Sequence, residues 1–167
     1  MVEYLDVVDS DDRVVGVASR EEVHGRPHLI HRIARVLVFN SAGDLFLQKR
    51  SENKDVQPGK WDTSVGGHVD RGESYDAAAY RETQEELGIH PRKLTFLYKH
   101  LYQDGYESEY VQSYAFTWDS EFHLNTDEIQ DGRFWQLDDI TTAVDPSRFT
   151  PQLLDELKHY YKHLRSA

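Results

Sequence analysis

Short runs of apolar residues, many of them alternating with polar residues, divide most of the chain into segments that are typical of β-strands. The clearest pair is residues 33–39 (IARVLVF) and 45–49 (LFLQK), which the turn residues Ser41–Asp44 connect. Two shorter runs near the N-terminus, residues 4–8 and 13–18, flank a polar turn segment and predict a hairpin. Further strands are expected at residues 61–65, 94–102, 110–118 and 133–137.

Two other segments have the spacing and the end signals of helices. Ser74 is a favourable N-cap, Ala77–Ala79 favour helix, and Gly88 stands where a left-handed C-terminal residue is expected. Thr150 and Pro151 begin a second, amphipathic segment. Its apolar positions are Leu153, Leu154, Leu157, Tyr160, Tyr161 and Leu164. Strands interspersed with helices predict an α/β fold, a layered α/β/α sandwich with a mixed central sheet.

The length and the absence of cysteine narrow the class of protein. With 167 residues, the chain is long enough for one domain with a substantial core. We expect residues 1–30 to form an N-terminal hairpin and extension packed on a domain of residues 31–165. The chain contains no cysteine, which excludes disulfides, thiolate metal sites and a cysteine nucleophile.

The charge and hydropathy indicate which partners the chain can have. A net charge of −11 argues against nucleic acid, whose phosphates require a basic surface. A small phosphorylated substrate remains possible, because a bound cation and a few local bases can reverse the sign inside a cleft. No run approaches the ~20 apolar residues that span a bilayer, and the acidic N-terminus lacks a signal-peptide core. We therefore expect a cytoplasmic protein without a membrane partner, and nothing in the pattern indicates its oligomeric state.

Three carboxylates of the first predicted helix stand out chemically. Glu82, Glu85 and Glu86 are spaced i, i+3 and i+4, so they share one helix face with Cβ atoms about 5–6 Å apart. Such close anions repel one another, and a hard divalent cation such as Mg²⁺, which takes oxygen ligands, would stabilise them. Gly66 and Gly67, at the preceding strand end, let the backbone pass close to a ligand. The alternative is an exposed acidic helix with i, i+4 ion pairs.

The segment from residue 67 to 89, GHVDRGESYDAAAYRETQEELGI, fits the pattern G-x5-E-x7-R-E-x-x-E-E-x-G followed by an apolar residue. This pattern resembles the Nudix box, and Thr83 is one departure, because the box usually has an aliphatic residue there. The resemblance implies the Nudix sandwich fold and Mg²⁺ or Mn²⁺ held by the three glutamates. It also implies that Arg81 and Glu73 form an ion pair that supports the site.

Other stretches are similar to isopentenyl-diphosphate isomerase and its hydrolase-like relatives, notably LFLQKRSENKDVQPGKWDTSVGGH. Those isomerases hold a metal with three histidines and two glutamates, and the corresponding residues here are His24, His31, His68, Glu107 and Glu109. Two departures argue against isomerase activity. Gly66 stands where the isomerases have a catalytic cysteine, and Glu82 stands where they have a basic residue. The chain therefore resembles a Nudix hydrolase with the shape of an isomerase.

The resemblance implies metal-dependent hydrolysis of a diphosphate linkage in a nucleoside diphosphate derivative or similar small compound. Glu85 is the first candidate for the general base and Glu128 the second, alongside Glu82 and Glu86. We expect Arg50 and Lys54 to contact phosphate, with Gly66 and Gly67 bringing the backbone close to the substrate. The alternatives are isopentenyl-diphosphate isomerase activity and a module that only binds a diphosphate ligand.

Overall fold

The strands form one nine-stranded mixed sheet organised around β3 (Ile30–Phe39), and the computed structural model describes all residues 1–167. β3 runs parallel to β8 (Ser108–Thr117) and antiparallel to β6 (Val65–His68). The other strands are β1 (Tyr4–Val8), β2 (Val14–Ser19), β4 (Leu45–Arg50), β5 (Trp61–Asp62), β7 (Thr95–Gln103) and β9 (Ile129–Trp135). The sheet is therefore mixed, as the sequence predicts.

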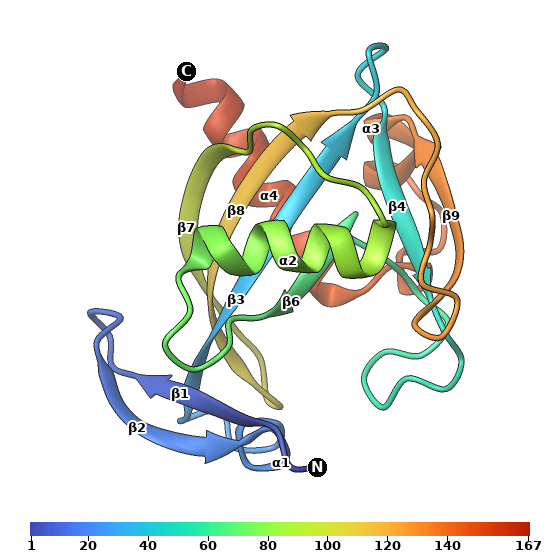
Figure 1. The fold of residues 1–167 in the computed structure, drawn as a ribbon. Helices are drawn as coiled ribbons and strands as arrows, with labels where there is room; N and C mark the ends of the chain where they lie inside the picture. Colours follow the sequence, from blue (N-terminus) through green and yellow to red (C-terminus); the bar gives the residue numbers. More distant parts are fainter.

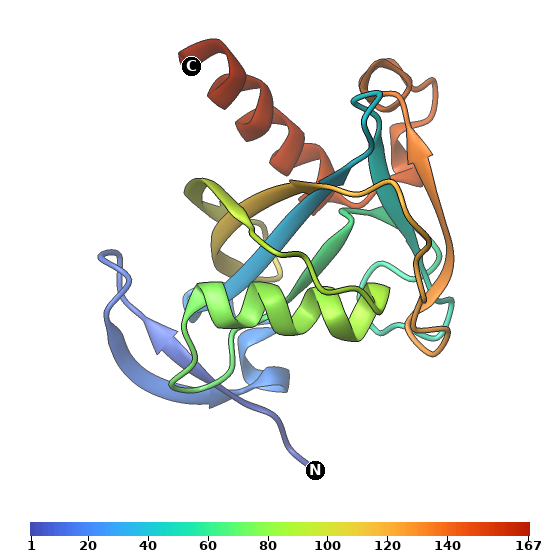
Figure 2. The ribbon, with the colours of Figure 1, turned by 45° about the horizontal axis from the view of Figure 1, so that its top comes forward.

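Two long helices cover the two faces of the sheet (Figure 1, Figure 2). Helix α2 (Tyr75–Leu87) packs on one face and α4 (Pro151–Ser166) on the other. Successive side chains of a strand point to opposite faces, so Val36 joins the core beneath α2 and Leu37 the core beneath α4. The prediction of an α/β/α sandwich is confirmed. No helix of the structure has the length and apolar character needed to cross a membrane.

The ends of α2 follow from its sequence. The Ser74 hydroxyl accepts a hydrogen bond from the Ala77 N–H at 3.1 Å, which caps the first turn. Gly88 ends the helix in the left-handed region, with φ of 64°, and donates its N–H to the Gln84 carbonyl at 2.9 Å. Glycine is needed there for two reasons: it adopts the positive φ readily, and a Cβ at this position would overlap His123. Thr150 caps α4 in the same way, as predicted.

The structure differs from the prediction in several places. The strand expected at residues 133–137 is β9, which begins earlier, at Ile129, and ends at Trp135. The single strand expected at residues 61–65 is divided into β5, which pairs with β4, and β6, which pairs with β3. Ser64 lies between β5 and β6 and bonds to both neighbouring strands. Its buried hydroxyl accepts a hydrogen bond from the Val38 N–H of β3 at 2.9 Å and donates one to the Phe46 carbonyl of β4. Two short helices, α3 (Leu137–Thr141) and the 3₁₀ helix η1 (Pro146–Arg148), were not predicted.

The N-terminal hairpin, β1 and β2, is followed by the four-residue helix α1 (Arg20–Val23) and lies to one side of the sandwich in Figure 1. It pairs with the central strand only where Val8 faces Ile30. Asp12 at the tip of the hairpin makes several polar contacts with the rest of the protein. Its carboxylate accepts bonds from Arg32 at 2.7 Å, from Tyr75 at 2.9 Å and from Lys99. These bonds tie the hairpin to β3, to α2 and to β7.

Candidate active site

One open cleft of about 650 Å³ gathers most of the residues that the sequence singles out. It is lined by 25 residues, of which only Ile33 and Val56 are hydrophobic, so a ligand in it meets polar and charged groups. The predicted site residues along its wall are His24, Arg50, Lys54, Gly66, Gly67, His68, Arg81, Glu82, Glu85, Glu107, Glu109 and Glu128. The remaining three, His31, Glu73 and Glu86, do not line the cleft.

Arg81 organises the acidic face of α2. Its Nη1 bonds to the Glu82 carboxylate at 2.6 Å and the Glu85 carboxylate at 3.3 Å. Its Nε and Nη2 donate to the two oxygens of Glu73, both at 2.9 Å, in the forked geometry that arginine forms with carboxylates. Nη2 also donates to the His68 carbonyl at 3.0 Å. Arg81 is therefore fully engaged with protein groups, and Glu73 holds it in place.

Burial of Glu82 raises its pKa to about 7, although the Arg81 guanidinium acts in the opposite direction. Glu86 is turned away from the cleft and is buried. It accepts hydrogen bonds from Gln48 Nε2 at 2.5 Å and from the Gly66 N–H at 3.3 Å. Burial, together with the charge of Glu82, raises the Glu86 pKa well above its ordinary value. A divalent cation would offset both effects, and carboxylate oxygens suit Mg²⁺ or Mn²⁺, but of the three carboxylates only Glu82 and Glu85 line the cleft.

The two glycines before the helix have different surroundings. A Cβ added to Gly67 would overlap the Glu82 carboxylate, so glycine is what allows this carboxylate to lie against β6. A Cβ on Gly66 would meet only Thr63 Oγ1 at 3.6 Å and Arg35 Cγ at 3.7 Å, which are ordinary contacts. The position of Gly66 therefore has room for a Cβ.

The bases of the cleft are paired with nearby carboxylates. Arg50 donates to Asp62 at 3.2 Å and to the Val56 carbonyl at 3.0 Å, and these contacts hold it in the wall. Lys54 lies 3.4 Å from the Glu128 carboxylate. The loop before β9 thus brings Glu128 to the cleft beside a predicted phosphate contact, close enough for its charge to raise the pKa of Glu82 further.

Three histidines meet beside the glutamates of α2. Ligand atoms of His24, His31 and His68 all lie within 4.8 Å of one another. His31 is fully buried, yet neither of its ring nitrogens has a hydrogen-bond partner, which is costly unless a ligand binds there. Burial lowers the pKa of His24 to about 4 and that of His31 well below its ordinary value, so both rings are neutral at pH 7. Neutral imidazoles are the form that binds a transition metal ion.

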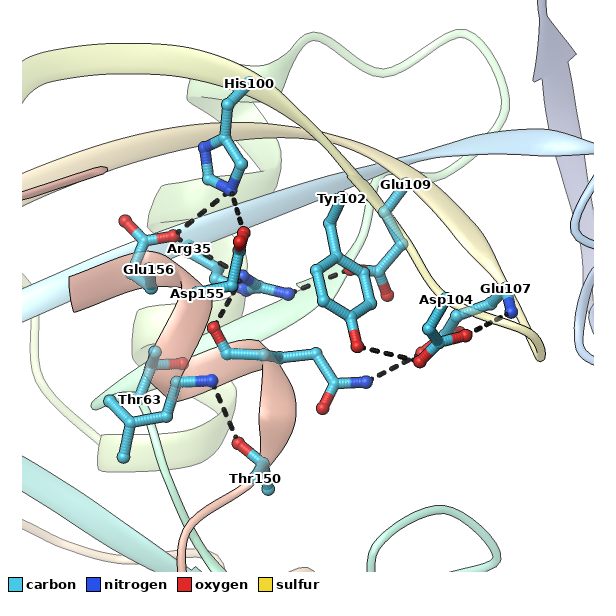
Figure 3. Close-up of polar contacts among 12 residues, drawn as sticks. Arg35, Thr63, His100, Tyr102, Asp104, Glu107, Glu109, Thr150, Asp155 and Glu156 are labelled. Carbon is cyan, nitrogen blue, oxygen red and sulfur yellow. Dashed lines mark hydrogen bonds and ion pairs between the residues drawn. The ribbon is translucent and has the colours of Figure 1, made fainter. Parts of the chain in front are cut away.

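Two buried glutamates complete this group, and Figure 3 shows their polar partners. His31, Glu107 and Glu109 form a second set whose ligand atoms lie within 4.8 Å of one another. Arg35 Nη2 lies 2.8 Å from Glu109, and the amide of Gln152 donates to Glu107 at 2.9 Å. Burial raises the pKa of Glu109 to about 8, against the effect of Arg35. The five residues offer three nitrogens and two carboxylates, which fits a transition metal ion.

Sequence reasoning missed several members of the site. Gln48 and Gln152 carry no signal of their own, because amides are common on strands and helices. The sequence offers Arg35 only as a secondary candidate for a phosphate contact or as a surface base, whereas the structure buries it in an ion pair with Glu109. A charged residue inside the apolar run IARVLVF is the signal that indicates such a pair. That pair extends to α4, where Arg35 Nη1 lies 3.4 Å from the Glu156 carboxylate.

Comparison with known proteins agrees with this geometry. The family model described as the NUDIX domain matches residues 29–153. An uncharacterized Nudix hydrolase of Streptomyces coelicolor is 48% identical over 105 residues, a match that covers 62% of this chain and 57% of that protein. Isopentenyl-diphosphate Delta-isomerase 2 of Photorhabdus laumondii is 34% identical over 141 residues, 82% of this chain and 79% of that protein.

Solved structures give the same result. A crystal structure of a Deinococcus radiodurans protein is 30% identical and has a TM-score of 0.70, covering 80% of this chain and 83% of that one. The resemblance inferred from the box is thus confirmed by the family model, by the relatives and by the fold. The chain belongs to the Nudix hydrolase family.

Proposed function

We propose that this protein hydrolyses a diphosphate linkage in a small, hydrophilic compound such as a nucleoside diphosphate derivative, with Mg²⁺ or Mn²⁺ as its cofactor. The observation that carries the proposal is that the acidic face of α2 opens onto the same cleft as two bases. Glu82 and Glu85 line that cleft together with Arg50 and Lys54. It therefore combines oxygen ligands for a hard cation with cationic groups for phosphate.

Glu82 and Glu85, which line the cleft, are the residues that would hold the cation, and Glu86 would join them only by leaving its bonds to Gln48 and Gly66. Bound there, a divalent ion supplies charge neutralisation of the diphosphate and acidifies a bound water. Arg81 is anchored by its two bonds to Glu73, so Glu82 could leave Arg81 for a cation without freeing the guanidinium. Gly67 contributes by letting the Glu82 carboxylate lie close to the strand.

The remaining steps belong to side chains of the cleft. Arg50 and Lys54 bind and orient the phosphate oxygens, which places the phosphorus for attack by water. Glu85 takes the proton of that water. Over half of its side chain is exposed (56%), in contrast to the buried Glu86. Glu128 is the other candidate for this base, because it also lines the cleft with half of its side chain exposed (50%).

Isomerisation of isopentenyl diphosphate is the second candidate function, and the histidine–glutamate group is the observation that favours it. Three features count against it. The chain has no cysteine, and Gly66 leaves that position without an acid or base. Arg35 is bonded to Glu109, and the cleft has only two hydrophobic residues to contact a hydrocarbon chain. A polar leaving group suits this wall better than an isoprenoid.

The first experiment measures phosphate release from a panel of diphosphate compounds with Mg²⁺ or Mn²⁺, and again after chelation by EDTA. The wild type is compared with Glu82→Gln, Glu85→Gln and Glu128→Gln. Glu121→Gln, an exposed glutamate outside the cleft, is the matched control. Removal of a general base lowers kcat by about 10²–10⁴-fold. Whichever of Glu85→Gln and Glu128→Gln lowers kcat more therefore identifies the base.

The proposal is supported if the wild type and the control show metal-dependent turnover and the Glu82 and Glu85 variants do not. Conversion of isopentenyl diphosphate without phosphate release would instead establish the isomerase. Metal-dependent binding of a diphosphate without either reaction would make the protein a binding module, as the third interpretation of the sequence holds.

A further inference from the structure

A second group of potential metal ligands lies outside the cleft, between β7 and α4. His100 comes from β7, and Asp155 and His159 come from successive turns of α4. Their ligand atoms all lie within 4.8 Å of one another, and none of the three residues lines the cleft. Figure 3 shows His100 pointing from its strand toward Asp155 and Glu156 of the helix.

The spacing of these atoms matches the edges of a metal polyhedron. His100 Nε2 lies 3.3 Å and His159 Nε2 lies 3.5 Å from the same carboxylate oxygen, Asp155 Oδ2. Ligands about 2.1 Å from a tetrahedral zinc ion are about 3.4 Å apart. The two imidazole rings lie nearly parallel, with centroids 3.9 Å apart, so His159 must turn to aim at the same point as His100. One third of the His159 side chain is exposed (34%), which leaves it freedom to turn.

The hydrogen bonding of His100 is the independent observation that points to a ligand. Only 5% of its side chain is exposed, and neither ring nitrogen has a hydrogen-bond partner. Asp155 Oδ2, although 3.3 Å away, is also without one. The 3.3 Å separation of these two atoms, drawn as a contact in Figure 3, is also the separation expected of two ligands of one ion. Without an ion, this buried ring carries the cost of unsatisfied nitrogens.

The donor set selects the class of ion. Two imidazoles and one carboxylate suit Zn²⁺ and similar transition ions, whereas Mg²⁺ prefers an all-oxygen shell. Glu156 Oε2, 3.8 Å from His100, already accepts from Arg35, and Glu156 Oε1 accepts from Tyr98, so a water would complete the coordination. We propose that His100, Asp155 and His159 bind a Zn²⁺-type ion that clips α4 to β7.

The position gives this clip a structural role. Asp155 and His159 lie on the helix whose first turns carry Gln152 and Glu156, the partners of Glu107 and Arg35 in the cleft wall. An ion joining α4 to β7 would therefore fix the helix that supports this wall. The expected effect is stabilisation by zinc of the protein alone, without substrate.

The test measures zinc binding by titration calorimetry on metal-free protein. Because the cleft also offers ligands, the measurements use a His24→Asn/His31→Asn background, which removes a ligand from both cleft groups. We expect one equivalent of Zn²⁺ and a rise in the melting temperature. Adding Asp155→Asn or His159→Asn should weaken binding more than about 100-fold, beyond the loss typical of outer-shell partners. His163→Asn, one turn further along α4 and outside the group, is the matched control and should keep the site.

Wild-type crystals soaked in zinc provide a second measurement that does not depend on any variant. Anomalous scattering at the zinc edge should place an ion among His100, Asp155 and His159. The proposal is overturned if the background protein binds no zinc, or if the Asp155 and His159 variants bind it as tightly as their parent. Loss of the site in the His163 control, or an absent anomalous peak, would overturn it equally.

Discussion

The contact between Gly67 and Glu82 permits a sharp test of how the active site is built. A Cβ on residue 67 would overlap the Glu82 carboxylate, whereas a Cβ on Gly66 would make only ordinary contacts, at 3.6 and 3.7 Å. Neither glycine has a positive φ, so backbone strain does not enter the comparison. Gly67→Ala and Gly66→Ala, adjacent on one strand, therefore differ in whether that carboxylate has to move.

The expected change in unfolding free energy follows from the hydrogen bond that Glu82 loses when its carboxylate moves. Moving Glu82 breaks its 2.6 Å bond from Arg81, and bonds to charged groups contribute about 1.5–3 kcal/mol. Because both side chains are partly exposed, at 14% and 27%, we expect about 1–2 kcal/mol here. Replacing glycine by alanine returns about 0.4–1 kcal/mol by restricting the unfolded chain. Gly67→Ala should thus lose about 1 kcal/mol of unfolding free energy, and Gly66→Ala should gain about 0.5 kcal/mol.

Urea unfolding of both variants, repeated in a Glu82→Ala background, isolates the contact as a double-mutant cycle. With the carboxylate removed, Gly67→Ala has nothing to displace and should stabilise the protein as Gly66→Ala does. The stabilisation of the protein by Mg²⁺ should also fall in Gly67→Ala, because a proposed ligand has moved. The reasoning is refuted if Gly67→Ala and Gly66→Ala have equal free energies of unfolding. It is refuted as well if the loss from Gly67→Ala persists in the Glu82→Ala background.

Two further predictions concern other parts of the fold. Burial raises the pKa of Asp12, but its bonds to Lys99, Arg32 and Tyr75 outweigh burial and lower it below 3.8. Asp12→Asn, which tolerates the positive φ of 60° there, should cost about 1–3 kcal/mol at pH 7. This difference in urea unfolding should shrink as the pH falls below about 4 and the wild-type carboxylate is protonated; a constant difference would contradict the assignment. Gly88→Ala should lower the unfolding free energy by about 1–3 kcal/mol, through the left-handed φ and the overlap with His123. An unchanged urea midpoint would exclude that explanation.

The parts of the fold that were predictable are those that neighbouring residues determine. Ser74 and Gly88 mark the ends of α2, and the alternation of β3 places its side chains on two faces. The box motif is equally local, so the acidic face could be predicted without a structure. The division of the 61–65 strand was not predictable, because it depends on Ser64 bonding to two strands distant in sequence.

In the candidate site, too, the sequence could not predict contacts between residues that are distant in the chain. Sequence could name Glu82, Glu85 and Glu86 together, yet it could not show that Glu86 turns inward to Gln48 while Glu85 stays exposed. That difference depends on Gln48 of β4 lying within hydrogen-bond distance of Glu86. The group at His100 was missed for a similar reason, since its ligands come from a strand and a helix more than 50 residues apart in sequence.

The parallel pairing of β3 with β8 has a consequence for the order of folding. Residues 30–39 must pair with residues 108–117, 78 positions further along the chain, whereas the β1–β2 and β3–β4 turns join neighbours. Local hairpins form early, and pairings with large sequence separation form slowly. The cleft includes residues from both strands of this long-range pairing, such as Arg35 on β3 and Glu109 on β8. Catalytic competence on refolding should therefore appear only with the last, long-range contacts, and early intermediates should have secondary structure without activity.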